Sequence, residues 1–217
     1  MRSKFDKQLA LLNKELIEMG ALCEQVIAMA AKAISGEDFS LAGQIVPLDS
    51  EIDQKERDIE SLCLKMLLQQ QPVARDLRQI SAALKMITDM ERIGDQAADI
   101  AEILPFVKGH SAEDHKIIAD MAKATIMMVT DSVDAYVKQD VTLAKSVISH
   151  DDVVDDYFSR VKQSLIKLIA KNPDEGETAI DMLMIAKYFE RIGDHATNIA
   201  EWVEFSVTGI HKGETEL

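Results

Sequence analysis

A five-residue string occurs twice in this chain. Residues 91–95 read Glu-Arg-Ile-Gly-Asp, and the same five residues return ninety-nine positions later at 190–194. The residues that follow are also similar in the two copies, as far as Glu102 and Glu201. Such self-similarity indicates an internal duplication. We therefore expect a fold made of two related halves, each of which ends in one acidic helix.

The repeat extends to the preceding segment of each half. Residues 38–42 (Asp-Phe-Ser-Leu-Ala) match residues 140–144 (Asp-Val-Thr-Leu-Ala) at a spacing of 102 positions. This spacing exceeds that of the five-residue string by three, so the second half has lost three residues in a turn. The longer spacing aligns two acidic pairs, Asp49 with Asp151 and Asp53 with Asp155.

Apolar residues recur at the spacing of amphipathic helices along most of the chain. We expect a kink or a break at Pro47, a helix that starts at Pro72, and a helix capped by Asp140. Short connections make neighbouring helices antiparallel. The expected fold class is therefore all-α, with two tandem three-helix bundles at residues 1–107 and 108–217. The expected helices cover about 4–35, 39–69, 72–104, 113–139, 140–171 and 177–206, with a linker at 106–111 and a tail from 208.

The charge and composition exclude some classes of function. The formal net charge is −14, which repels nucleic-acid phosphates and disfavours an anionic membrane surface. The same charge attracts metal ions or a cationic partner. Hydrophobic residues make up 47% of the chain and aromatic residues only 5%, which is typical of packed helices rather than sheets.

The two cysteines and the N-terminus indicate a cytoplasmic protein. Cys23 and Cys63 form no Cys-x-x-Cys pair, and we expect both to be reduced thiols in the core. The N-terminal residues are charged and lack the apolar region of a signal peptide. No apolar run approaches the roughly 20 residues that a membrane-spanning helix needs.

Acidic residues form a stripe on the last expected helix of each half. Glu91, Asp95, Asp99 and Glu102 are spaced four, four and three, so they fall on one helical face. If the acidic pairs of the preceding helices face this stripe, four or more carboxylates converge in each half. The second stripe is Glu190, Asp194, Asn198 and Glu201, and the preceding helices add Asp49, Asp53, Asp151 and Asp155.

Three interpretations of these stripes are open: a cation site, a solvated acidic face, and a patch for a basic partner. Like charges four residues apart destabilise a helix by about 0.2–0.5 kcal/mol per pair. Neither Asp95 nor Asp99 has a basic residue four positions away, and the same holds for Asp194. The repeated, uncompensated stripe favours the cation site.

The ligand chemistry favours a hard cation. Carboxylate oxygens suit Mg²⁺, Mn²⁺, Ca²⁺ or oxidised iron, whereas zinc and copper favour Cys or His ligands. His150 and His195 are each adjacent to an acidic residue, so on a helix they point about 100° away from it. We expect both to be surface or packing histidines.

The glycine and arginine of each string have ordinary structural explanations. Glycine within a helix costs about 1 kcal/mol relative to alanine. Gly94 and Gly193 therefore indicate either close helix–helix approach or room for a metal cluster or water beside the carboxylates. Arg92 and Arg191 are expected to pair with carboxylates of a neighbouring helix.

The sequence contains no recognisable catalytic motif. A Glu-x-x-His pair of the di-iron oxidases, a Gly-x-Ser-x-Gly string, a P-loop and a Gly-x-Gly-x-x-Gly string are all absent. Residue patterns alone thus predict a duplicated helical protein with two acidic, metal-binding seams. A ferritin-like storage protein or a di-metal enzyme is the alternative.

Three motifs resemble the PhoU family of phosphate-transport regulators. They are the repeated Glu-Arg-Ile-Gly-Asp string, the Asp-x-x-Leu-Ala stretches, and Gln-Pro-Val-Ala-Arg-Asp-Leu-Arg at residues 71–78. The resemblance covers residues 5–209 and implies tandem three-helix bundles without enzymatic activity. It also implies a cytoplasmic homodimer that negatively regulates the phosphate regulon. The implied partners are the ATPase of the phosphate ABC transporter and a phosphate-responsive sensor histidine kinase.

The resemblance also implies metal ligands. Glu/Asp-x-x-x-Asp motifs of this family bind clusters of iron or divalent ions, so Fe, Mn or Mg is expected here. Asn198 replaces the acid found at Asp99, which leaves the second seam with one charge fewer. The implied ligands are Asp49, Asp53, Glu91, Asp95 and Asp99 in the first half, and Asp151, Asp155, Glu190 and Asp194 in the second.

Overall fold

The structure is a computed structural model that describes residues 2–36, 39–70, 72–107 and 112–210. Long helices account for nearly all of these residues. No strand occurs among the described residues, so the predicted all-α class is confirmed. Short 3₁₀ turns lie at η1 (Phe39–Leu41), η2 (Leu104–Phe106) and η3 (Pro173–Glu175). The long helices are α1 (Arg2–Gly36), α2 (Ala42–Gln70), α3 (Ala74–Ile103), α4 (Ala112–Lys138), α5 (Val141–Lys171) and α6 (Gly176–Thr208).

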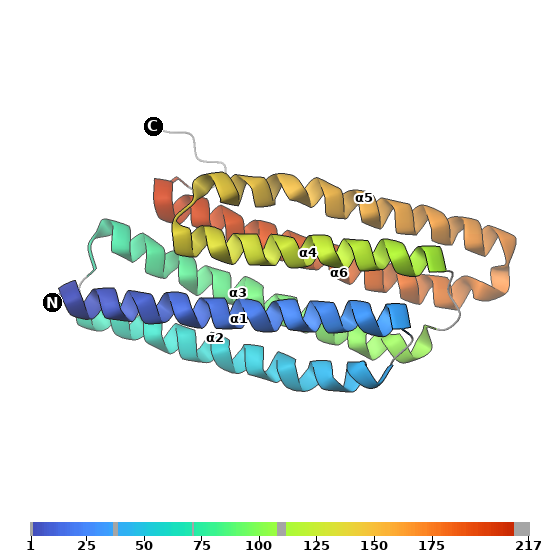
Figure 1. Cartoon of the computed structure of the whole chain (residues 1–217), viewed down its shortest axis with the longest axis horizontal. Helices are drawn as coiled ribbons and strands as arrows, with labels where there is room; N and C mark the ends of the chain where they lie inside the picture. Colours follow the sequence, from blue (N-terminus) through green and yellow to red (C-terminus); the bar gives the residue numbers. More distant parts are fainter. Residues whose placement is uncertain (1, 37–38, 71, 108–111, 211–217) are drawn as a thin grey trace.

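The helices lie along one common axis (Figure 1). Helices α1, α2 and α3 pack on one another, and α4, α5 and α6 do the same. The two bundles join along two contacts, where α3 packs against α6 and α1 packs against α4. Their buried apolar side chains form one continuous core. The domain division at residues 107 and 108 stays a prediction.

Several helix ends agree with the sequence. Helix α1 ends at Gly36. Asp140 caps α5, because its Oδ1 accepts hydrogen bonds from the backbone N–H groups of Thr142 and Leu143 at 2.9 and 3.0 Å. The expected linker at 106–111 and the expected tail from 208 lie largely outside the described residues.

The predictions at two prolines differ in part from the structure. Helix α2 runs through Pro47, so the predicted break does not occur there, and the alternative of a kink stays a prediction. Pro47 lies six residues into α2, where its missing N–H removes only one hydrogen bond near the helix end. Helix α3 begins at Ala74 and not at Pro72, because Val73 takes the extended conformation of an N-cap residue.

The core contains both cysteines. Cys23 and Cys63 are buried and free, as predicted. Burial raises the pKa of both thiols, that of Cys63 to about 12. A buried hydrogen bond also crosses between the halves, because the Tyr136 hydroxyl donates to the Gln79 carbonyl at 2.9 Å. In the described part of the chain, no helix combines the length and the apolar character needed to cross a bilayer.

Candidate metal seams and the cavity between the halves

The two acidic helices of the first half face each other. We call their carboxylates, Asp49 and Asp53 of α2 with Glu91, Asp95 and Asp99 of α3, the first seam. Asp49 points at the α3 backbone: a β-carbon added at Gly94 would lie 2.6 Å from Asp49 Oδ1 and 3.1 Å from Ile52 Cδ1. Gly94 therefore leaves space that a seam carboxylate fills.

The charges of the first seam act on one another across the two helices. Burial raises the pKa of Asp49 to about 6, and the negative charges of Asp53, Asp95 and Asp99 contribute to this rise. The pKa of Glu91 is raised by burial and then by Asp95. Carboxylates of α2 and α3 therefore lie close enough to act on one another. The described residues contain no group of three or more of them that could hold a metal, so the convergence of four or more ligands stays a prediction.

Asp49 provides an observation that fits a cation ligand. Its Oδ1 is buried and has no hydrogen-bond partner among the described residues. An unpaired carboxylate oxygen in this position is costly, and a hard cation is the partner that such oxygens prefer.

Glu56 of α2 also lies near the first seam, although the sequence motifs do not indicate it. Burial raises its pKa, as do the charges of Glu60 and Asp53.

The second seam repeats this arrangement with looser contacts. It consists of Asp151 and Asp155 of α5 with Glu190 and Asp194 of α6. Burial raises the pKa of Asp151 to about 6, and the charges of Asp194, Asp155 and Glu190 contribute to this rise. A β-carbon at Gly193 would lie 3.3 Å from Asp151 Oδ1, so the carboxylate sits less tightly against this glycine than in the first seam.

The arginines differ from expectation. Arg92 pairs within its own helix, at 2.8 Å from Nη1 to Asp95 Oδ2 and 3.4 Å from Nε to Glu91 Oε2. The expected pairing with a neighbouring helix is therefore wrong for Arg92, because a spacing of three already brings Asp95 within reach. Lys187 pairs with Glu190 at the same spacing. The stripes are thus partly compensated by basic residues three positions away.

Arg191 extends from α6 toward the first half. Burial raises the pKa of Asp99, as do the charges of Glu102 and Asp95, and the positive charge of Arg191 opposes this rise across the α3–α6 contact. In the described residues, Arg191 has no ion pair within 4.0 Å and no hydrogen bond from its side chain.

The described part of the chain contains no group of three or more His, Cys, Asp or Glu side chains that could hold a metal ion as they stand.

His195 and Asn198 join the halves through a residue that the motifs do not reveal. Asp89 Oδ1 of α3 lies 2.9 Å from His195 Nδ1 and accepts a hydrogen bond from Asn198 Nδ2 at 3.0 Å. His195 is therefore a packing residue, as expected. Asn198 removes one charge from the second stripe and also supplies the amide donor that Asp89 accepts from.

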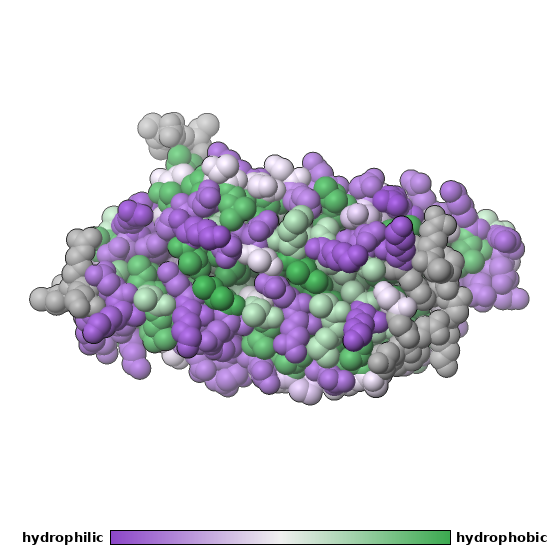
Figure 2. Space-filling model, in the orientation of Figure 1, coloured by the Kyte–Doolittle hydropathy of each residue, from purple (hydrophilic) through white to green (hydrophobic). Residues whose placement is uncertain are grey.

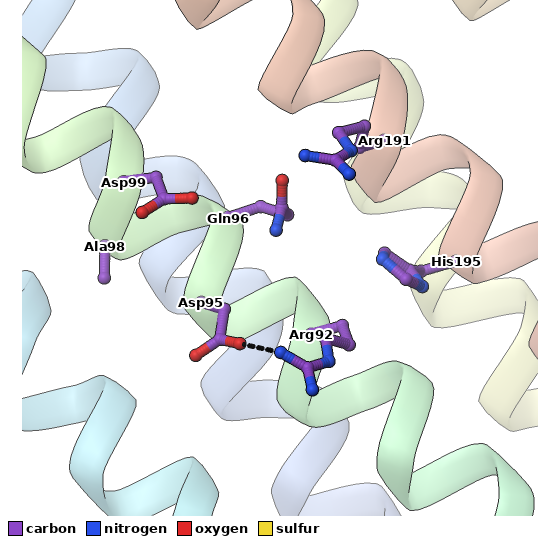
Figure 3. A pocket seen from close by; sticks show the side chains of 7 residues that line it. All are labelled: Arg92, Asp95, Gln96, Ala98, Asp99, Arg191 and His195. Carbon is purple, nitrogen blue, oxygen red and sulfur yellow. Dashed lines mark hydrogen bonds and ion pairs between the residues drawn. The ribbon is translucent and has the colours of Figure 1, made fainter.

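A cavity of about 590 Å³ lies beside this contact, between α3 and α6. In Figure 3, Arg191 and His195 extend from α6 toward α3, and Gln96 extends from α3 toward α6. Arg92 lies at the lower end of the cavity with its link to Asp95, and Asp99 lies on the α3 wall. His150 lines a smaller cavity of about 110 Å³ with Met127 and Asp131.

A single protein-family model matches both halves of the chain. The PhoU domain model matches residues 16–104 and again 118–203. A protein of Clostridium acetobutylicum named phosphate-specific transport system accessory protein PhoU homolog is 34% identical over 210 residues, which are 96% of each chain. A protein of the same name from Pseudomonas aeruginosa is 33% identical over 99% of this chain and 90% of its own.

Solved structures agree with these matches. The crystal structure of PhoU from Pseudomonas aeruginosa superposes with a TM-score of 0.88 at 32% identity and covers 95% of this chain and 100% of the other. The phosphate transport system regulatory protein PhoU from Streptococcus pneumoniae superposes with a TM-score of 0.85 at 26% identity, over 95% and 98%. The chain therefore belongs to the PhoU family, whose members are accessory proteins and not enzymes.

Proposed function

We propose that this protein is a cytoplasmic regulator of phosphate uptake and of phosphate-starvation signalling. It acts as a homodimeric adaptor between the ATPase of the phosphate ABC transporter and a sensor histidine kinase, and it negatively regulates the phosphate regulon. The observation that carries the proposal is the match, over nearly the whole chain, to relatives named phosphate-specific transport system accessory proteins.

Exposed apolar side chains support an adaptor with two docking surfaces. Among the described residues, eight of the exposed large apolar side chains lie near the two hairpin ends, which lie at opposite ends of the long axis (Figure 1), and the others are spread over the rest of the surface. Figure 2 shows apolar side chains beside hydrophilic ones at the right-hand end, where the α5–α6 hairpin lies. Apolar groups exposed in this way are common at protein–protein contacts. The α2–α3 end has Leu64, Leu68, Val73 and Leu77, and the α5–α6 end has Ile166, Ile169, Ile180 and Met184.

We also propose that each seam binds a hard cation, with Mg²⁺, Mn²⁺ or iron as the candidates. The unpaired Oδ1 of Asp49 and the glycine beside it support this for the first seam. A bound cation supplies positive charge that joins α2 to α3 and α5 to α6. It thereby stiffens the two hairpins that carry the proposed docking surfaces.

A pull-down with purified partners tests the adaptor. Wild-type protein is expected to retain both the transporter ATPase and the cytoplasmic part of the kinase. Charged substitutions at one end, Leu68→Glu with Leu77→Glu, are expected to release one partner. Substitutions at the other end, Ile166→Glu with Ile180→Glu, are expected to release the other.

The matched control places the same substitution on exposed apolar residues away from both ends. Ile17→Glu in α1 and Val153→Glu in α5 change side chains that are 48% and 39% exposed, compared with 47–84% for the four end residues. This control is expected to retain both partners. Loss of neither partner from either end variant, or failure of the wild type to retain a partner, would contradict the adaptor proposal.

A further inference from the structure

The α3–α6 cavity brings together two arginines from equivalent positions of the repeat. Arg92 and Arg191 are each the second residue of the repeated string. Helices α3 and α6 run antiparallel (Figure 1), and both arginines are exposed and line one cavity between these helices. The duplication therefore places two arginines beside one cavity, together with the carboxylates of Asp95 and Asp99.

The hydrogen-bonding groups of this cavity are incompletely used. Arg191 has no side-chain hydrogen bond or ion pair within the described residues. Arg92 uses Nη1 and Nε for Asp95 and Glu91, which leaves its Nη2 donors available. Gln96 reaches into the cavity, is only 7% exposed, and has a buried side-chain oxygen with no partner among the residues described.

We propose that this cavity binds inorganic phosphate between Arg92 and Arg191. A guanidinium presents parallel N–H donors that match the oxygens of a tetrahedral oxyanion, and two of them from opposite helices hold it from two sides. A flip of the Gln96 amide exchanges the positions of its oxygen and its NH₂ group. After this flip, the NH₂ group donates a hydrogen bond to the anion. The choice of phosphate among oxyanions rests on the proposed function.

Asp95 links this site to the first seam. Asp95 is the ion-pair partner of Arg92 and also a proposed cation ligand. A cation in the seam takes up the negative charge of Asp95 and thereby frees Arg92 for phosphate. Thermodynamic linkage makes the effect reciprocal, so phosphate also strengthens cation binding.

Calorimetric titration of phosphate into the full chain tests the site. The titration is done with Mg²⁺ present and after chelator treatment, with sulfate at matched ionic strength as the comparison anion. We expect one phosphate per chain, bound at least fivefold more tightly with Mg²⁺ and more tightly than sulfate. Arg191→Gln is expected to weaken phosphate binding at least tenfold.

Arg160→Gln is the matched control, because Arg160 is an exposed arginine on α5 with a distant partner, Asp156 at 4.0 Å. It is expected to bind phosphate as the wild type does. A thermal melt of each variant confirms that it is folded. The phosphate site would be overturned if phosphate gave no heat of binding under either condition, or if wild type and Arg191→Gln bound it equally. The coupling to the seam would be overturned if phosphate bound equally with and without Mg²⁺.

The phosphate titration and the pull-down test the phosphate site and the adaptor function independently. Partners retained without phosphate binding would leave the adaptor standing and overturn the oxyanion site. Phosphate bound as expected without partner retention would support the site and overturn the adaptor.

Discussion

Asp49 Oδ1 fills the space that Gly94 leaves open: a β-carbon at Gly94 would lie only 2.6 Å from it. Glycine is a poor helix residue, yet it stands in the middle of α3. Its position is explained by the carboxylate that lies against it from α2. This contact fits the first of the two explanations considered for this glycine, close helix–helix approach. The second explanation, room for a metal cluster or water beside the carboxylates, stays a prediction.

Gly94→Ala should separate the cation site from the stability of the fold. The new methyl group forces Asp49 away from α3, while the helix itself gains up to about 1 kcal/mol. We expect a small change in unfolding free energy without cation, and a first seam that binds Mn²⁺ much more weakly. Calorimetric titration of Mn²⁺ measures the affinity.

Gly193→Ala is the matched comparison for that experiment. A β-carbon at Gly193 meets Asp151 and Val154 at 3.3 Å, so small adjustments accommodate it. We expect the second seam to keep most of its affinity for Mn²⁺ in this variant. If Gly94→Ala and Gly193→Ala lose equal affinity for Mn²⁺, the close contact between the Asp49 carboxylate and Gly94 does not determine cation binding.

The cation-free protein should become less stable as the pH rises from about 4 to about 7. The folded-state pKa of Asp49 and of Asp151 is about 6, above the ordinary value of 3.8. Between these values the folded state binds more protons than the unfolded state, so the free energy of unfolding falls with rising pH. Both side chains are partly exposed, so we expect about 1 kcal/mol for each.

Urea unfolding at pH 5 and pH 7 after chelator treatment measures this dependence. Asp49→Asn should remove its share of the fall and stabilise the cation-free protein at pH 7. Asp156→Asn changes a carboxylate that is 69% exposed and should leave the dependence unchanged. The same slope for all three proteins would contradict the buried-carboxylate explanation.

Asn198→Asp should weaken the contact between the halves. The change restores the acid of the first copy, but it replaces the donor that Asp89 accepts from at 3.0 Å with a second carboxylate. We expect a loss of about 1–2 kcal/mol of unfolding free energy. Asp89→Asn added to Asn198→Asp should recover part of it, and a double-mutant cycle with no coupling would refute the role given to Asn198.

Local patterns in the sequence predict most of the secondary structure and the pairing of the seams. The three-and-four spacing of apolar residues predicts the six long helices, and the duplication alone aligns Asp49 with Asp151. The start of α3 is predicted less well, because the helix begins at Ala74, after the extended Val73, and not at Pro72. Helix boundaries depend on the conformation of single residues, which periodicity does not specify.

Contacts between the halves are beyond the reach of sequence patterns. Asp89 and His195 are 106 positions apart, and they meet only because α3 packs on α6. The prediction that the stripes lack compensating bases considers only a spacing of four. Arg92 and Asp95 are three apart, a spacing that equally brings side chains together on a helix.

The account depends most on cation binding in the two seams. A thermal melt of chelator-treated protein with and without added Mn²⁺, Mg²⁺ or Fe³⁺ tests it on wild type, on Asp95→Asn/Asp194→Asn, and on the equally charged control Asp58→Asn/Asp156→Asn. A cation at 100 times its dissociation constant should stabilise wild type and the control by about 2.7 kcal/mol for each occupied seam, and the seam variant should lose this effect. No shift in wild type for any ion, or an undiminished shift in Asp95→Asn/Asp194→Asn, would contradict the claim.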